Sequence, residues 1–358
     1  MSAAHGGPAA GRHLSPGVSV AICCHNGAAR LRPTLARLAE QRVPDGLAWE
    51  VILIDNASTD GTAEVAADAW PATAPVPLRV VREPRLGLTY ARHRALTSAR
   101  FETLSLVDDD NWVHADWVSS AAALMDRLPH VAACGGMVDP VYEVAPPPWF
   151  ERHKGWFALG AQGPRGGDVT WTRGMLFGAG LIVRTSAWHQ LIEAGFKPLL
   201  IDRTGAQLTT GGDVELCYAL RLAGWCLWYE PSLHLQHFMP AGRMRWQYLR
   251  ALFRSNGAAS IRYIPYLSSA RPRAGLRLGP RETWPWLVFL SFATLVRRPR
   301  RTLRAVRQLC EGDDYSLELE RQFGRVTELL RLRNDLHKMI LDVRHAAWRA
   351  PRQPSCSQ

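Results

Sequence analysis

Leu104-Ser105-Leu106-Val107-Asp108-Asp109-Asp110-Asn111 is the stretch from which the expected fold follows. Its first four residues, three of them apolar, have the pattern of a short strand buried in a parallel sheet. Three consecutive acids then fall at the carboxyl end of the strand, where open α/β sheets bind their ligands. Adjacent carboxylates repel one another, and Mg²⁺ or Mn²⁺ held by one or two of them together with substrate phosphates would relieve that repulsion. Taken alone, the run also fits a solvated acidic loop.

Segments with strand and helix patterns alternate on both sides of this stretch. The alternation predicts an α/β fold with a doubly wound, mostly parallel sheet. Residues 142–168, rich in proline, glycine and aromatics, are expected to form a binding loop, and 171–184 a further strand. The other expected strands are 18–24, 51–54, 78–81, 104–107, 131–134, 225–229 and 233–237.

The composition is that of a folded globular chain with an excess of positive charge. The 358 residues are 47% hydrophobic and 21% charged, and the net charge of +11 is carried almost entirely by arginine. Arginine suits phosphate groups, so the charge fits phosphorylated substrates or an anionic membrane surface. Nucleic acid is not an expected partner, because the arginines are not interleaved with aromatics in a recognisable module. The seven cysteines show no CxxC spacing, which favours reduced, mostly buried thiols over a zinc site.

Four regions are expected along the chain. Residues 1–16 form a disordered lead without an apolar signal core, and 17–240 form the α/β domain. Residues 241–349 form a helical, arginine-rich extension, and 350–358 a disordered tail. Because no run of about 18 apolar residues is present, no membrane-spanning helix is expected, and we place the protein in the cytoplasm.

The helical extension contains an apolar segment, 284–292, which is followed by Arg297-Arg298-Pro299-Arg300-Arg301. Tryptophans at one end and arginines at the other suit a helix that lies in the interface, as a peripheral contact with the cytoplasmic face of the inner membrane. The alternative is a helix that packs on the α/β domain and turns an arginine-rich face to solvent.

Polar residues also follow other predicted elements. His25-Asn26-Gly27 follows the first strand, and Asp55 ends the second. Asp213 lies at the cap or in the first turn of a helix, where it is either functional or an N-cap carboxylate. Glu215, one helical turn from Gly212, is either a functional acid or an exposed charge that favours the helix dipole.

These motifs, taken in order, resemble the family 2 glycosyltransferases, which have the GT-A fold. The resemblance covers about residues 18–240. Three positions depart from the family pattern, since Cys23 replaces a proline, His93 an asparagine and Gly212 an acid. The six motifs that carry the resemblance are His25-Asn26-Gly27, 54–62, 87–93, Asp108-Asp109-Asp110, Gly178-Ala179-Gly180 and 211–216.

On the donor side, the resemblance implies a nucleotide-sugar, with a UDP-sugar as the expected substrate. Asp55 is implied at the nucleotide base, where the backbone near His25 lines the same pocket. Arg92 is implied on the diphosphate side. Asp108 is implied at the ribose or donor sugar, and Asp109 belongs to the same nucleotide-sugar-binding set.

The resemblance also implies a divalent cation, Mn²⁺ or Mg²⁺, and one general base. Asp110 and His237 are the implied metal ligands, with His234 as the alternative histidine. Asp213 is the implied base and matches the second acid of the family's Glu-Asp motif. The first acid of that motif is Gly212 here, so a neighbouring group that helps to position the base is missing.

The implied chemistry is coherent on physical grounds. A divalent cation screens the charge that develops on a departing nucleoside diphosphate, and a hydroxyl nucleophile needs a base within hydrogen-bond reach. A direct displacement with one base inverts the anomeric centre. The expected acceptor is a hydroxyl of a saccharide or lipid-linked glycan, in polysaccharide or glycoconjugate biosynthesis.

Two alternatives remain open. A sugar nucleotidyltransferase would need a glycine-rich phosphate loop with a basic residue after the first strand, and His25-Asn26-Gly27-Ala28 does not look like one. A catalytically silent scaffold of the same fold would be favoured if Asp110 or Asp213 were missing.

Overall fold

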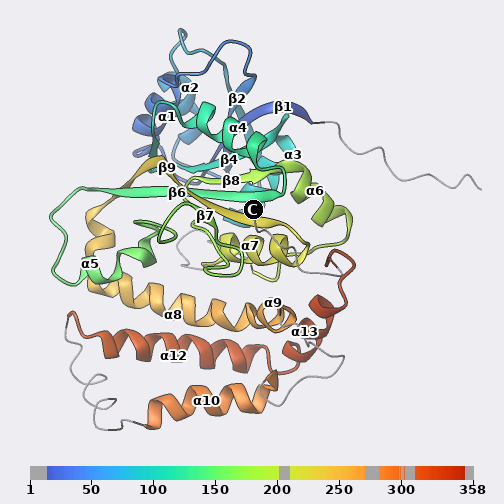
Figure 1. Ribbon diagram of the computed structural model, residues 1–358. Helices are drawn as coiled ribbons and strands as arrows, with labels where there is room; N and C mark the ends of the chain where they lie inside the picture. Colours follow the sequence, from blue (N-terminus) through green and yellow to red (C-terminus); the bar gives the residue numbers. More distant parts are fainter. Residues whose placement is uncertain are drawn as a thin grey trace, which may run out of the picture.

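The computed structural model describes residues 14–200, 210–270, 282–297, 299, 302 and 311–350. Its centre is a nine-stranded mixed sheet with the strand order β3-β2-β1-β4-β8-β6-β9-β5, and β7 pairs with β9 (Figure 1). The strands are β1 (Ser15–Cys24), β2 (Trp49–Asn56), β3 (Leu78–Glu83), β4 (Phe101–Asp108), β5 (Asn111–Val113), β6 (Val131–Tyr142), β7 (Gly167–Asp168), β8 (Leu181–Arg184) and β9 (Cys226–Met239).

The expected α/β fold class is confirmed. Strands β3, β2, β1 and β4 run parallel, β8 is antiparallel to β4 and β6, and β6 and β9 are parallel to each other. The strand expected over 171–184 is wrong in extent, because only Leu181–Arg184 is a strand. The disordered lead expected over 1–16 lies outside the described residues as far as residue 13, but β1 begins at Ser15.

Two hydrophobic cores lie on the two faces of the sheet, and strand alternation divides the side chains between them. In β1, Val20 and Ile22 belong to the core with α1 and α4, whereas Ala21 and Cys23 belong to the core with α3, α6 and α7. The helices are α1 (Leu31–Ala39), α2 (Thr62–Ala69), α3 (Leu88–Ser98), α4 (Trp117–Arg127), α5 (Phe150–His153), α6 (Thr185–Glu193), α7 (Gly212–Leu222), α8 (Trp246–Arg262), α9 (Ile264–Ser269), α10 (Trp284–Val296), α12 (Asp314–Arg331) and α13 (Leu336–Arg344), with 3₁₀ turns η1 (Lys154–Phe157) and η2 (Ala241–Met244).

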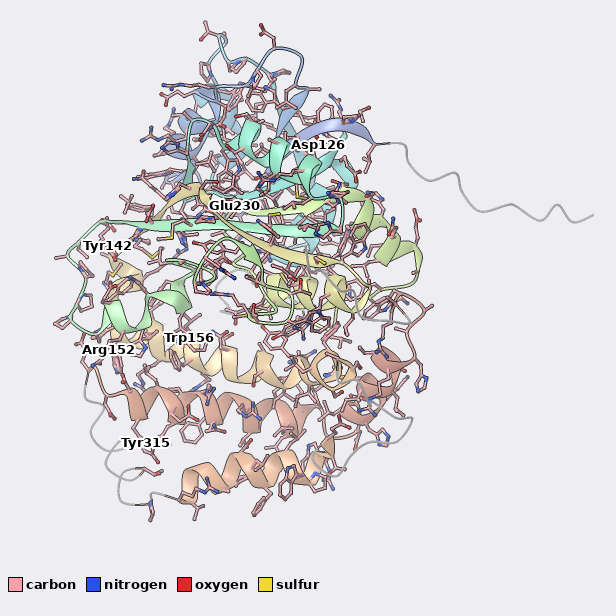
Figure 2. The ribbon with its side chains drawn as sticks, in the orientation of Figure 1. Asp126, Tyr142, Arg152, Trp156, Glu230 and Tyr315 are labelled. Carbon is pink, nitrogen blue, oxygen red and sulfur yellow. The ribbon has the colours of Figure 1, made fainter. Side chains whose placement is uncertain are left out.

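The helical extension forms a separate layer against the sheet domain. Helices α8, α12 and α10 lie one beyond another, and α8 is nearest to the sheet (Figure 1). The last part of the extension is two helices rather than one, since α12 ends at Arg331 and α13 begins at Leu336. The loop before β7 reaches this layer, where Trp156 packs against Phe253 of α8 with ring centroids 4.6 Å apart (Figure 2).

The cysteines only partly follow expectation. Cys23, Cys24, Cys134 and Cys217 are free and buried. Cys226 is disulfide-bonded, so the expectation of reduced thiols is wrong for this residue.

The helices of the described residues include none that is both long enough and apolar enough to cross a membrane. Of the tail expected over 350–358, only Ala350 is described, and its N–H donates to the Leu222 carbonyl at 2.9 Å.

Two glycines set the distance between α8 and α12. A Cβ atom on Gly257 would lie 2.1 Å from the Arg321 carbonyl oxygen, and one on Gly324 would lie 1.9 Å from that of Arg254. The two backbones therefore cross where neither helix has room for a side chain.

Replacing Gly257 with alanine should push these helices apart. We expect the free energy of unfolding to fall by about 1–3 kcal/mol, because overpacking a close contact outweighs alanine's better helix propensity. Urea unfolding measures the change. Gly242→Ala is the matched control, since a Cβ there meets no atom within 4 Å. A Gly257→Ala protein as stable as the wild type would contradict this helix spacing.

Candidate functional site

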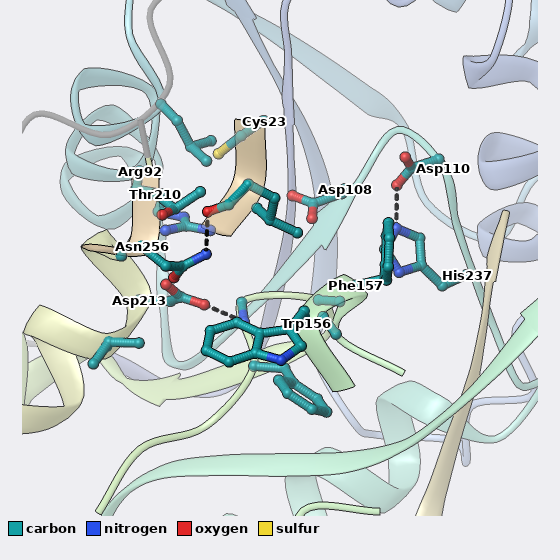
Figure 3. Close-up of a pocket in the computed structure, with 18 of the residues that line it drawn as sticks. Cys23, Arg92, Asp108, Asp110, Trp156, Phe157, Thr210, Asp213, His237 and Asn256 are labelled. Carbon is teal, nitrogen blue, oxygen red and sulfur yellow. Dashed lines mark hydrogen bonds and ion pairs between the residues drawn. The ribbon is translucent and has the colours of Figure 1, made fainter. Parts of the chain in front are cut away.

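A cavity of about 590 Å³ lies where the carboxyl ends of β1, β2 and β4 face α7, α8 and the loop around η1 (Figure 3). It gathers most of the residues that the sequence singled out. The predicted site residues that line it are His25, Arg92, Asp108, Asp109, Asp110, Asp213 and His237. Asp55 is not among the lining residues, whereas its neighbour Asn56 is.

The three consecutive acids take three different environments. The backbone N–H of Asp108 donates to Asn111 Oδ1 at 3.3 Å, but its carboxylate accepts no side-chain hydrogen bond from the described residues. The Asp108 side chain is drawn at the cavity in Figure 3. Burial, with the charge of Asp110 adding to it, raises the pKa of Asp108 to about 6. This carboxylate is the one left available to a ligand.

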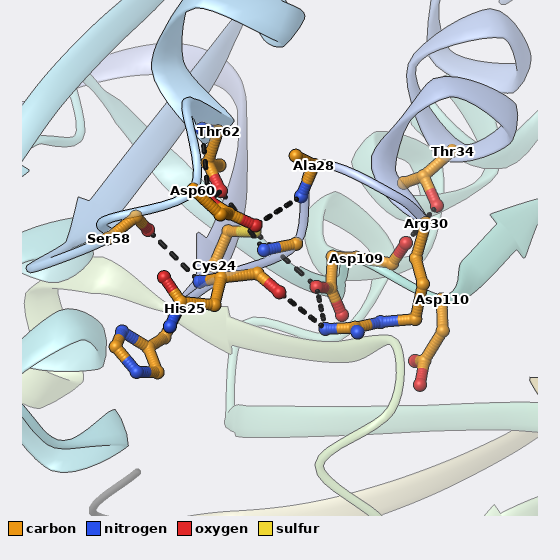
Figure 4. A network of polar contacts seen from close by, with 12 residues as sticks. Cys24, His25, Ala28, Arg30, Thr34, Ser58, Asp60, Thr62, Asp109 and Asp110 are labelled. Carbon is orange, nitrogen blue, oxygen red and sulfur yellow. Dashed lines mark hydrogen bonds and ion pairs between the residues drawn. The ribbon is translucent and has the colours of Figure 1, made fainter.

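Asp109 is engaged by α1 (Figure 4). Arg30 Nη2 donates to its Oδ2 at 2.7 Å, and the Cys24 thiol donates to the same oxygen at 3.4 Å. Thr34 Oγ1 donates to its backbone carbonyl at 2.9 Å. Asp109 therefore fixes the start of α1 to the end of β4, and its nucleotide-sugar-binding role stays a prediction.

Asp110 is nearly fully buried beside His237 and Arg243. Strand β5 pairs antiparallel with β9 so that Asn111 faces His237, which leaves Asp110 Oδ1 3.4 Å from His237 Nε2. Arg243 Nη2 donates to Asp110 Oδ2 at 2.8 Å, and Arg243 Nη1 lies 2.9 Å from His237 Nε2. Because a guanidinium only donates, Nε2 accepts this bond and the ring proton lies on Nδ1, a buried atom without a partner in the described part of the chain.

His234 lies elsewhere. It is exposed, and its Nδ1 is 3.2 Å from Asp139 Oδ2. Strand β9 continues to Met239, so His237 shares the buried face of the strand rather than ending it.

Asp110 and His237 supply an oxygen and a nitrogen of the kinds that Mn²⁺ accepts. No group of three or more His, Cys, Asp or Glu side chains that could hold a metal occurs among the described residues. The pair therefore fits a cation that takes its other ligands from substrate phosphate and water. Arg243 bonds to both groups, so such a cation requires that its guanidinium move.

Asp213 faces these acids from α7. It lies in the first turn, and Gly211 rather than Asp213 is the N-cap, so the N-cap interpretation is wrong. Asp213 Oδ2 accepts the Gly178 N–H at 2.8 Å. A Cβ on Gly178 would lie 2.6 Å from Arg92 Nη2 and 3.1 Å from Asp213 Oδ2, which shows how closely Arg92 and Asp213 converge.

The loops after β1 and β2 are joined to each other at the edge of the cavity. The backbone N–H groups of Asn26, Gly27 and Ala28 donate to Ser58 Oγ, Thr62 Oγ1 and Asp60 Oδ2 at 3.0–3.1 Å (Figure 4). This network turns the backbone after β1 across the strand ends.

The candidate nucleotide residues meet this network differently. His25 Nδ1 lies 2.8 Å from the Asn56 carbonyl oxygen. Asp55 Oδ1 accepts the Ser58 N–H at 3.1 Å, so it stabilises the loop, and its role at the base stays a prediction.

Several lining residues could not be found from the sequence. Arg30 and Arg243 compensate the acids, and Trp156 lies in the loop that was expected to bind a ligand. Asn256 and Tyr263 come from the helical extension, outside the domain boundary expected at 240. No local pattern marks these positions, because each reaches the cavity through packing between distant segments.

Glu215 is buried, and it is not among the residues that line the cavity. Its carboxylate accepts the Leu199 and Leu200 N–H groups at 2.6 and 3.1 Å and the Tyr266 hydroxyl at 2.5 Å. It thus ties α7 to α9 and to the segment before α7. Burial outweighs these hydrogen bonds and raises the pKa of Glu215 to about 7.

A family model described as glycosyl transferase family 2 matches residues 19–189, which include β1, β4 and the acids. Residues 19–189, slightly less than half of the chain, therefore match this family. Among curated relatives of this chain, the succinoglycan biosynthesis protein ExoM of Rhizobium meliloti is 23% identical, over 81% of this chain and 89% of ExoM. The uncharacterized glycosyltransferase YfnE of Bacillus subtilis is 29% identical over 38% of this chain, which spans only 34% of YfnE.

Solved structures show a distant likeness to this chain. S. aureus TarS 1-349 in complex with UDP has a TM-score of 0.47 at 16% identity, over 89% of this chain and 92% of that one. GalNAc-T7 with UDP, GalNAc and Mn²⁺ also scores 0.47 at 16% identity, over 73% of this chain and 52% of that one.

Replacing Glu215 with glutamine should change how stability depends on pH. The folded state binds the Glu215 proton more tightly than the unfolded state, whose pKa is near 4.5, so this stabilisation is present at low pH and is lost as pH rises through about 7. Relative to Glu215→Gln, the wild type should lose about 2 kcal/mol between pH 5 and pH 8.

Urea unfolding at both pH values measures this difference. Glu64→Gln, at an exposed position on α2, is the control and should follow the wild type at both. If the Glu215→Gln curve also runs parallel to the wild type, Glu215 does not have a raised pKa.

Proposed function

We propose that this glycosyltransferase is an inverting, metal-dependent enzyme that moves a sugar from a nucleotide-sugar, a UDP-sugar in our assignment, to a hydroxyl of a saccharide or lipid-linked glycan. The observation that carries the proposal is that Asp108 and Asp110 lie across one cavity from Asp213. This gives a site for the donor diphosphate on one side and a base on the other.

The donor lies at the strand ends in this proposal. Asp108 offers a free carboxylate to the ribose or sugar hydroxyls, and Arg92 offers a cation to the diphosphate. Asp110 and His237 would hold a divalent cation, which when bound screens the charge of the leaving diphosphate. His25 and Asn56 border the nucleotide end, with Asp55 just outside the lining.

Asp213 acts as the general base. One of its oxygens is fixed by the Gly178 N–H, and the other accepts no hydrogen bond from the described residues, which leaves it for an acceptor hydroxyl. As the hydroxyl oxygen forms its bond to the anomeric carbon, Asp213 takes the hydroxyl proton. The bond from that carbon to the diphosphate oxygen breaks, and the nucleoside diphosphate leaves with the electron pair. A single displacement of this kind inverts the anomeric centre.

The acceptor lies toward the helical extension. Trp156, Asn256 and Tyr263 line that part of the cavity and combine aromatic faces with polar groups, a combination that suits a sugar ring. ExoM, named for succinoglycan biosynthesis, is a relative over most of the chain and supports a glycan acceptor. A sugar nucleotidyltransferase and a silent scaffold are less well supported, because Asp110 and Asp213 both border the cavity and no basic phosphate loop follows β1.

Two substitutions should separate donor binding from chemistry. Asp110→Asn should weaken UDP binding in Mn²⁺ by at least about tenfold, because the bridging cation loses its carboxylate. Asp213→Asn should bind UDP like the wild type, while release of UDP from UDP-sugars falls by about 10²–10⁴-fold.

Calorimetry with UDP, GDP and dTDP, with Mn²⁺ or EDTA, measures the first effect, and a UDP-release assay over saccharide acceptors measures the second. Asp116→Asn, at an exposed acid in the same segment, should change neither. Binding of none of the three nucleotides would favour the silent scaffold, and undiminished turnover in Asp213→Asn would remove the assigned base.

We also propose a peripheral contact between α10 and an anionic membrane. Leu287 and Ser291 are buried toward the rest of the protein, so the helix does pack on it. Its outer side is apolar and exposed, and exposed Arg297 follows it at the start of the arginine-rich sequence. The large exposed apolar side chains on the described part of α10 are Trp286, Phe289, Leu290, Phe292 and Val296.

Charged substitutions on that side should release the protein from vesicles. Flotation with phosphatidylglycerol vesicles should fall at least about fivefold for Phe289→Asp combined with Phe292→Asp, because a charge in the interface opposes burial of the helix. Val144→Asp, at an exposed apolar position in another loop, is the control. Equal flotation of all three proteins would refute the contact.

A further inference from the structure

The Arg243 guanidinium bonds to the two groups that would ligate the cation. Its Nη2 donates to Asp110 Oδ2 at 2.8 Å, and its Nη1 donates to His237 Nε2 at 2.9 Å. The other Asp110 oxygen accepts the Asn111 side-chain amide at 3.1 Å. The atoms that would ligate a metal, the two Asp110 carboxylate oxygens and His237 Nε2, therefore each already accept a hydrogen bond.

This arrangement excludes a second cation at the same place. A divalent ion on His237 would need the single Nε2 lone pair that accepts from Arg243, and at Asp110 it would lie close to the guanidinium charge. Arg243 stays charged there. Although its burial acts in the opposite direction, the carboxylates of Asp110, Asp108 and Asp109 raise the pKa of Arg243.

The position of Arg243 in the chain allows its guanidinium to move away from Asp110 and His237. It belongs to η2, a single turn between β9 and α8, and it reaches Asp110 only through its long side chain. A diphosphate offers a guanidinium anionic oxygens in a geometry that suits two parallel hydrogen bonds. Arg30, which also lies at this acid cluster, donates to Asp109 rather than to Asp110.

We propose that Arg243 is an internal cation that blocks the metal position until a nucleoside diphosphate enters and gives the guanidinium a new partner. Divalent-cation binding is then conditional on nucleotide, and by thermodynamic reciprocity the cation strengthens nucleotide binding by the same factor. This inference rests on the proposed function, because it takes the diphosphate as the ligand that displaces Arg243.

The test is direct Mn²⁺ binding without nucleotide, measured from the electron paramagnetic resonance signal of free Mn²⁺. The wild type should bind Mn²⁺ weakly, and Arg243→Gln should bind it at least tenfold more tightly. Arg243→Lys keeps a cation with fewer donors and should be intermediate. Arg321→Gln removes a positive charge from the same cavity without touching Asp110, so it should match the wild type.

Adding UDP provides the second measurement. In the wild type, UDP should tighten Mn²⁺ binding at least tenfold, and in Arg243→Gln this coupling should fall toward one. Thermal melting gives a readout that is independent of activity, since Mn²⁺ alone should raise the melting temperature of Arg243→Gln more than that of the wild type. If Arg243→Gln does not fold, the Lys variant carries the comparison.

Equal Mn²⁺ affinity of the wild type and the Arg243 variants without UDP would overturn the inference, as would a coupling by UDP that the substitution leaves unchanged. Either result leaves UDP-sugar turnover by the wild type intact, and the proposed function would stand. A wild type that binds no nucleotide contradicts the proposed function instead, while tighter Mn²⁺ binding in Arg243→Gln would still show the block.

Discussion

The compensation of three adjacent carboxylates at the end of β4 is the constraint on which the site depends. Three like charges in sequence cannot all be left unpaired in a largely buried place. Two of the three carboxylates point in different directions and form ion pairs. Asp109 pairs with Arg30 at the start of α1, and Asp110 pairs with Arg243. Asp108 is left facing the cavity. The same two pairs fix the first helix and the turn after β9 to the end of one strand.

The sequence predicted those parts of the site that local pattern determines. An apolar run predicts a strand, and acids after it fall at the ligand edge of the sheet, so Asp108 to Asp110 could be placed without coordinates. The helix start at Asp213 followed from its glycine-bearing turn in the same way. The extra strand over 171–184 was wrong because alternating glycines and apolar residues also suit an irregular segment, and only its last four residues pair in the sheet.

The orientation of each acid could not be predicted, because it depends on partners that are distant in the chain. Asp109 meets a residue 79 positions away, and Asp110 meets one 133 positions away. His237 was partly predictable. Leu233 and Leu235 alternate with polar residues, and continuing that alternation for one more step places His237 on the buried face. The sequence pattern did not show that β9 continues beyond His237 to Met239.

The helical extension is part of the site as well as a layer packed against it. Gly257 lies between two cavity residues, Asn256 and Ser260, and the crossing of α8 with α12 occurs there. The distance between these helices therefore sets the position of the cavity wall. A boundary at residue 240 separates the family's motifs from the rest of the chain, but it does not separate the site from its surroundings.

Residue 212, directly before Asp213, is glycine rather than an acid, and other contacts position Asp213 instead. A neighbouring carboxylate could position the base, and here Gly212 cannot. The Gly178 N–H instead fixes one oxygen of Asp213, and Arg92 lies against the same glycine. Glu215 holds the first turn of α7 from behind through Leu199, Leu200 and Tyr266. The direction of Asp213 thus comes from a backbone donor and from a helix held in place by Glu215, and its second oxygen accepts no hydrogen bond from the described residues.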